Sequence, residues 1–522
     1  MGKDTVVLLW VAFVFFAAVF FAITSSLLLY KNKKTGFAKS FHRSVIPCLF
    51  SILLSLSIWP PVHRVYDDEF AFISQSVNIV SFGKPGITLK GSRVQPDILG
   101  SWAGNPKLPG FAYLESILLF LTNDHDLSFF LLNLVLGAIS AALIYRMTWL
   151  LTLSDATAWW SAVFFASLPA RITYSMSASS DIAGLFFFLL FFLFTLEFKD
   201  QSLKRILYAA VFCGLFSICI KPFYTIPVFL GLAAALFMYR KAGLLDKKTL
   251  TQIGLDLFCL SLPIVCAVPV FLFSDSKAGA YSFLFMFDNL RLSAFYLFNS
   301  EQSAYLTALA AAFAILRSLF YKRDELVNIA AGWLLLGLLV FSVFNSGGIS
   351  YPGHAYSDRY FLLLAFPFVF LAARAAVDTV IKIRFPYLGL LLFVMLAGNA
   401  YFASRNLTDE ANDNFHFKKI LLLKTIARYV PYDAYIIDES AATVTAVSVK
   451  RSIQTDVFLG GDHPRKVIYL QGIAGDLYSS NDPGRMKLLR SILNAKYKCV
   501  LMLPAPVKLK DLSATPVLCT LK

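Results

Sequence analysis

The chain has 522 residues, of which 58% are hydrophobic and only 15% are charged. Soluble globular proteins carry roughly 25% charged residues, so this composition indicates a protein embedded in a lipid bilayer. The net charge of +15 does not indicate nucleic-acid binding, because the lysines and arginines lie in short clusters between apolar segments and no nucleic-acid-reading motif is present. Basic clusters of this kind set membrane topology, since they stay on the cytoplasmic side.

The first apolar segment, residues 5–30, is long enough to cross a membrane. The basic segment 31–43 that follows is expected to be cytoplasmic, which places the N-terminus outside. A second span over 44–61 leads into a large external loop, 62–127. Within that loop the apolar stretch 108–122 is short for a span, and we expect it to form a helix in the membrane interface.

Further apolar segments predict more spans. They cover residues 128–151, 157–170, 182–198, 205–221, 222–239, 251–274, 303–320, 326–344, 360–375 and 386–404. The basic residues between them alternate in side as the positive-inside rule requires, provided that 108–122 does not cross the membrane. The predicted fold class is therefore a polytopic α-helical membrane protein of about twelve transmembrane helices, with both termini outside.

From residue 405 the composition changes to that of a soluble domain. Alternating patterns predict strands at 435–437, 467–470 and 499–503 and a helix at 484–494, which indicates a small external α/β domain over 405–522. The preceding parts are an N-terminal helix with its basic loop, 1–43, and a transmembrane catalytic domain, 44–404. Cys499 and Cys519 lie in the tail, and an oxidising compartment would permit a disulfide between them. The sequence leaves that pairing open.

The predicted topology gathers charged residues on the external side, although they lie far apart in the sequence. These residues are Asp67, Asp68, Glu69, Lys107, Asp181, Lys221, Asp358 and Arg359. Carboxylates at a membrane surface can act as general bases or bind a divalent cation such as Mg²⁺ or Mn²⁺, and basic side chains bind phosphate. An acidic triplet alone would be explained by a solvated loop, so the prediction of a site rests on the convergence of charges on one face.

Four short motifs lie in a fixed order on this external side. The first is Asp68-Glu69 in YDDEFAF, and the second is Pro106-Lys107-Leu108-Pro109 before the apolar interfacial stretch. The third is LPARITYSMSASSDIAGLFFFLL, which contains Asp181, and the fourth is Arg359-Tyr360 with Pro367 downstream. Together they resemble the GT-C superfamily of polyprenyl-phosphate-sugar-dependent glycosyltransferases, in particular the protein O-mannosyltransferases and the lipid A aminoarabinose transferases.

The resemblance covers roughly residues 44–404 and departs from the family in two features. The span 5–30 precedes the usual first span, and the lysine motif reads Lys-Leu-Pro instead of Lys-Pro-Pro. The oligosaccharyltransferase signature, a Trp-Trp-Asp-type motif after the spans, is absent from the sequence. This absence argues against transfer of a whole glycan to asparagine.

The resemblance implies a GT-C fold and a single inverting displacement at the anomeric carbon of a polyprenyl-phosphate sugar, which enters from the bilayer. The acceptor would be a protein, a lipid or a glycan. Asp68 would be the base, although the choice between Asp67 and Asp68 stays open. The other implied roles are donor-phosphate binding by Lys107, Lys221, Arg359 and Tyr360, and acceptor or metal positioning by Asp67, Glu69, Asp181 and His354, with Asp68 and Asp181 as the metal ligands.

Two other functions compete with the glycosyltransferase. A transporter or flippase of a lipid-linked anion would carry charged residues midway along its spans and broken helices, whereas most charges here lie at span ends. A non-catalytic membrane scaffold would give no reason for acids and bases to gather on one face.

Overall fold

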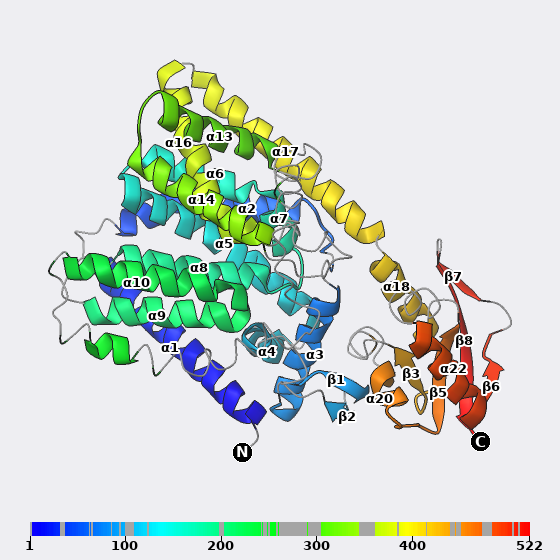
Figure 1. Ribbon diagram of the computed structural model, residues 1–522. Helices are drawn as coiled ribbons and strands as arrows, with labels where there is room; N and C mark the ends of the chain where they lie inside the picture. Colours follow the sequence, from blue (N-terminus) through cyan, green and yellow to red (C-terminus); the bar gives the residue numbers. More distant parts are fainter. Residues whose placement is uncertain are drawn as a thin grey trace.

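A bundle of helices is joined at one end to a smaller domain built on a β-sheet (Figure 1). The end of the bundle that meets the sheet is called the hairpin end below, and the opposite end the far end. The computed structural model describes residues 3–31, 37–61, 63, 66–84, 86–92, 95–99, 109–122, 125–197, 203–241, 243, 248, 251–256, 259, 290, 304–343, 361–383, 386–413, 415–438, 444, 450–471, 483–503, 506–509 and 512–522.

The bundle consists of long apolar helices with shorter ones between them. The longer helices are α1 (Lys3–Lys31), α2 (Phe37–Leu56), α3 (Tyr66–Phe82), α5 (His125–Thr152), α8 (Asp181–Leu196), α9 (Leu203–Ile220), α10 (Thr225–Lys241), α13 (Tyr305–Phe320), α14 (Glu325–Val343), α16 (Ala365–Ile383) and α17 (Pro386–Asp413). The shorter ones are α4 (Gly110–Thr122), α6 (Asp155–Ala166), α7 (Pro169–Ser175) and the 3₁₀ helices η3 (Pro222–Tyr224) and η6 (Leu362–Leu364).

The described part of the chain contains four helical segments that are long and apolar enough to cross a membrane. These are Leu127–Thr152, Pro222–Lys241, Leu362–Thr379 and Tyr387–Asp409. The membrane character predicted from composition is therefore confirmed. The total of about twelve spans and their sidedness stay predictions.

The predicted span 157–170 is wrong. Helix α6 ends at Ala166, and α7 begins at Pro169 after an extended Leu168. A proline disfavours the helical conformation of the residue before it and fits the first position of a new helix, so the chain breaks here. With 12 residues, α6 is about 18 Å long, well short of the roughly 30 Å hydrocarbon core.

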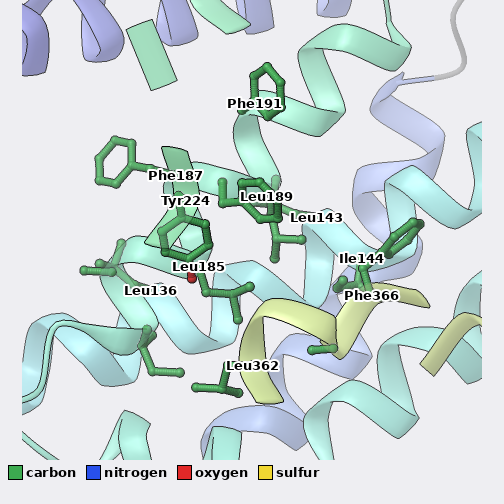
Figure 2. Packing of buried hydrophobic residues seen from close by; sticks show 14 of the residues in the cluster. Leu136, Leu143, Ile144, Leu185, Phe187, Leu189, Phe191, Tyr224, Leu362 and Phe366 are labelled. Carbon is green, nitrogen blue, oxygen red and sulfur yellow. The ribbon is translucent and has the colours of Figure 1, made fainter. Parts of the chain in front are cut away.

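One apolar core holds α5, α8, α16 and both 3₁₀ helices together. Figure 2 shows Leu143 of α5, Leu185 of α8 and Tyr224 of η3 within this core. Gly184 of α8 allows the close approach of η3, because a Cβ at Gly184 would lie 2.8 Å from Cε2 of Tyr224. This contact places the start of η3 beside the first turns of α8.

The smaller domain contains a mixed eight-stranded sheet with the order β2-β1-β4-β3-β5-β8-β6, and β7 pairs with β8. The elements are β1 (Thr88–Gly91), β2 (Pro96–Leu99), β3 (Tyr435–Asp438), β4 (Ser452–Gln454), β5 (Lys466–Gln471), β6 (Tyr497–Leu501), β7 (Val507–Leu509) and β8 (Leu512–Leu521), with helices α18 (Phe415–Ala427), α20 (Thr455–Leu459) and α22 (Pro483–Lys496). The predicted C-terminal α/β character is confirmed, and β3, β5, β6 and α22 match the predicted strands and helix.

Two strands of this sheet come from the first loop, 62–127, which the sequence did not predict. Strand β1 pairs antiparallel with β4, so that Lys90 lies opposite Ile453. Nζ of Lys90 also donates to Oδ1 and Oδ2 of Asp462 at 2.8 and 2.9 Å, and the hydroxyl of Tyr435 donates to Oδ2 of Asp97 at 2.5 Å. The β1–β2 hairpin and the C-terminal domain therefore form one structural unit.

Cys499 of β6 and Cys519 of β8 are directly opposite each other in this sheet. They form a disulfide, which answers the question that the sequence left open. The bond links β8 to β6, the strand at one end of the sheet order.

Candidate active site

The structure describes the side chains of three predicted site residues, Glu69, Asp181 and Lys221. Asp67 and Asp68 belong to the first turn of α3, but their side chains are not among the described ones. Further predicted site residues lie outside the described residues: Lys107, His354, Asp358, Arg359 and Tyr360.

Glu69 is fully buried at the start of α3, and its contacts include His63 and the backbone of Ala178. Its Oε2 lies 2.6 Å from Nδ1 of His63 and accepts the backbone N–H of Ala178 at 3.2 Å. The His63 ring packs against Phe70 and Phe130, with ring centroids 4.8 and 5.3 Å apart. Because a buried carboxylate is strongly destabilising without partners, these contacts fix α3 against the segment that joins α7 to α8.

That joining segment, residues 176–180, is itself held by a buried amide of α5. Nδ2 of Asn133 donates to the carbonyl oxygens of Ser177 and Ser179 at 2.7 and 2.8 Å. The hydroxyl of Ser177 donates to Oγ of Ser179 at 3.0 Å. Since buried backbone carbonyls must find donors, Asn133 determines the path of the chain that leads to Asp181.

Asp181 begins α8 and is almost completely buried. The helix dipole stabilises a carboxylate at this position, and Nζ of Lys221 donates to its Oδ1. Lys221 lies between α9 and η3 in an extended conformation, which Pro222 imposes on the residue before it. The ion pair therefore joins the beginning of α8 to the end of α9.

These contacts bring together segments that are far apart in the sequence. The first loop reaches the 176–180 segment through Glu69 and Ala178, and that segment leads directly into Asp181 and its partner Lys221. All of them lie at the hairpin end of the bundle (Figure 1).

A metal ion does not fit Asp181 as the structure shows it. Oδ1 of this carboxylate faces the ammonium of Lys221, and a second cation at the same oxygen would be repelled. No group of three or more His, Cys, Asp or Glu side chains among the described residues is arranged to hold a metal. The chemistry considered below therefore uses no step through a metal.

His63 and Asn133 were missed by the sequence analysis, which singled out His354 instead. His63 lies six residues before its partner Glu69, a spacing that has no regular meaning across a helix start. Asn133 lies within the apolar segment 128–151, where an amide requires buried partners. That isolated amide was the signal that could have identified it.

The whole fold is similar to those of solved membrane transferases. ArnT from Cupriavidus metallidurans bound to undecaprenyl phosphate matches with a TM-score of 0.56 at 11% identity, over 93% of this chain and 98% of that one. The apo state of ArnT gives a TM-score of 0.53 at 12% identity with the same coverage. The apo Archaeoglobus fulgidus oligosaccharyltransferase gives 0.50 at 13% identity, over 88% of this chain and 69% of that one.

The chain has the GT-C fold. The fold that the four short motifs implied is thus confirmed by three-dimensional structure. No protein-family model and no curated protein sequence matches the chain, so the similarity is carried by the fold and not by sequence identity. In this fold the segment before α8, which Glu69 contacts, leads into the Asp181–Lys221 pair.

Proposed function

We propose that this chain is a membrane glycosyltransferase that moves a sugar from a polyprenyl-phosphate donor to an acceptor on the external face. The observation that carries the proposal is the GT-C fold, which extends over 93% of the chain and matches an enzyme solved with undecaprenyl phosphate. The convergence of Glu69 with the Asp181–Lys221 pair at one end of the bundle supports it independently.

The proposed reaction is a single displacement. An acceptor hydroxyl or amine attacks the anomeric carbon while the bond from that carbon to the phosphate oxygen breaks. Asp68 takes the proton of the acceptor, and the polyprenyl phosphate leaves with the bonding electron pair. Lys107, Lys221, Arg359 and Tyr360 stabilise the negative charge that develops on the phosphate.

Glu69 takes a positioning role in this scheme and not the role of the base. Its contacts to His63 and to the Ala178 backbone hold the start of α3, where Asp67 and Asp68 also lie. We therefore keep the base among Asp67 and Asp68, with Asp68 favoured.

The external location of the site is supported by the disulfide. Disulfides persist in oxidising compartments and are rare in the cytosol, and Cys499–Cys519 lies in the sheet that includes the β1–β2 hairpin. The hairpin belongs to the same loop as Glu69. We therefore propose that the hairpin end faces outward and that the protein is a multi-pass integral membrane protein.

The test is transfer of radiolabelled sugar from a panel of polyprenyl-phosphate donors by the purified full chain in lipid nanodiscs. Acceptors would be a hydroxyl-containing peptide, a lipid and a glycan. Wild type is compared with Asp68→Asn, Glu69→Gln and the control Asp409→Asn, whose carboxylate is 57% exposed on α17. Label should leave the carrier with wild type and the control only, and a parallel reaction with a chelator reports whether transfer requires a divalent metal.

Two results would overturn the proposal. Full transfer by the double variant Asp67→Asn/Asp68→Asn would show that neither carboxylate is the base. Binding of every donor without release of sugar, combined with movement of the lipid between leaflets, would establish the transporter. The buried Arg171 of α7 is one charged residue that a transporter could use, but it donates to the carbonyl of Ser51 and the hydroxyl of Ser55, which accounts for it structurally.

A further inference from the structure

The far end of the bundle contains a charged cavity of about 370 Å³ between α13, α14 and α16. It is distant from the candidate active site, because it lies where α13 ends and α14 begins (Figure 1). Its lining includes four basic and three acidic side chains. The volume falls within the range of small-molecule sites, so the charge of the lining decides what would bind.

The acidic residues of the lining are largely engaged by the protein itself. Asp378 accepts from Arg317, and Asp324 accepts from Arg374. Asp324 also caps α14, since its Oδ1 accepts the backbone N–H groups of Leu326 and Val327 at 3.1 and 3.3 Å. These carboxylates are therefore structural and hold both arginines in place at the cavity wall.

Lys322 and Arg323 are the remaining basic residues of the cavity. Both are exposed, and neither has an ion-pair partner among the described residues. They face only one further carboxylate of the lining, that of Glu325, whose position in the first turn of α14 is already favoured by the helix dipole. The cavity thus keeps a net positive charge.

The residues that directly precede the cavity residues Lys322 and Arg323 in the chain are apolar and exposed. Phe320 and Tyr321, which directly precede Lys322, are each 83% exposed, and Leu319 beside them is 64% exposed. Aromatic side chains at the end of an apolar helix typically lie at the level of lipid headgroups. The ligand that satisfies both features carries a phosphate and an acyl chain.

We propose that this cavity binds the headgroup of an anionic phospholipid from the cytoplasmic leaflet. Lys322 and Arg323 would contact the phosphate, and Phe320 and Tyr321 would lie along the acyl chains. Basic pockets between transmembrane helices on the cytoplasmic side bind such headgroups. The choice of the cytoplasmic leaflet rests on the proposed outward-facing hairpin end, whereas lipid binding at this cavity does not require that the protein transfers a sugar.

The test compares lipid retention by purified full-length variants. Wild type, Lys322→Ala/Arg323→Ala and the control Arg240→Ala/Lys241→Ala are incubated with equal amounts of phosphatidylglycerol and phosphatidylcholine of matched chains, and bound lipid is counted by native mass spectrometry. The control removes two exposed basic residues from the end of α10, outside the cavity lining.

We expect wild type and the control to retain phosphatidylglycerol selectively and the cavity variant to lose it by about tenfold or more. Equal retention by all three proteins would overturn the proposal. A separate arm adds inorganic phosphate at the concentration of the lipid. Retention of phosphatidylglycerol in that arm supports the lipid site, whereas complete displacement would overturn it in favour of a site for free phosphate. Because no sugar is transferred, failure here leaves the proposed transferase untouched.

Discussion

Replacing Asp462 by Asn should loosen the β1–β2 hairpin from the C-terminal domain. Lys90 and Asp462 lie 372 residues apart in the sequence, and Nζ of Lys90 contacts both carboxylate oxygens. The hairpin also pairs with β4, but only through Lys90 and Gly91 of β1. The ion pair is therefore a substantial part of what holds the first loop to the sheet.

The size of the effect follows from burial. The side chains of Lys90 and Asp462 are 17% and 32% exposed, which places the pair between a solvated and a buried one. Exposed pairs contribute about 0–1 kcal/mol, and breaking a fully buried pair costs about 3–5 kcal/mol. We expect a loss of about 1–2 kcal/mol, which raises the opening equilibrium of the hairpin by about 5- to 30-fold.

Hydrogen–deuterium exchange of the amides in residues 88–99 measures that equilibrium. The control is Lys466→Met, which removes an ion pair to Asp433 whose side chains are 42% and 61% exposed and which should leave the hairpin unchanged. The exchanged pair Lys90→Asp/Asp462→Lys should restore protection. Wild-type protection in Asp462→Asn, or equal loss of protection in the control, would refute the reasoning.

Three further predictions concern stability. Gly110→Ala should destabilise the bundle by about 1–3 kcal/mol, because the new Cβ would lie 2.6 Å from the backbone of α9. The control Gly398→Ala on α17 meets nothing within 4 Å and should be neutral or stabilising by up to about 1 kcal/mol. Thermal unfolding of the two variants in detergent measures the difference. Replacing Cys499 and Cys519 by Ser should lower the stability of the C-terminal domain by about 3 kcal/mol, as expected for a disulfide that closes a loop with a sequence separation of 20. The loss should be seen as faster proteolysis of that domain and not of the helix bundle. Burial lowers the pKa of His463, so the unfolded chain binds more protons than the folded one, and stability should fall as the pH drops from 7 through 6.5 to the folded pKa. His463→Asn should make this decline shallower in a series of unfolding measurements at different pH. An unchanged slope would show that His463 does not cause the decline.

The bundle could be predicted from the sequence because its signals are local. Apolar length alone identified α1, α5 and α9, and the acid at the start of α8 indicated the Asp181 end of that helix. The sequence analysis did not predict the break between α6 and α7, because the apolar character continues across Pro169. A hydropathy reading ignores the backbone restriction that this proline imposes.

The candidate site could be predicted only in outline. Placing charges on one side of the membrane brought Glu69 near Asp181 and Lys221, and the contacts through Ala178 agree with that arrangement. The pairing of Lys221 with Asp181 and of Glu69 with His63 depends on the relative rotation of neighbouring helices. That rotation is determined by packing, for example the close approach of η3 to Gly184, which no local pattern in the sequence records.

The shared sheet also orders events during biosynthesis. Strand β1 is made early, but its partner β4 begins at Ser452, after the last predicted span has been synthesised. Until then the hairpin presents an unpaired β-edge at the membrane surface, which is a template for association with other chains. A chain that ends after residue 404 would carry this open edge permanently, so a nonsense mutation there should yield an aggregating membrane protein and not merely one that lacks a domain.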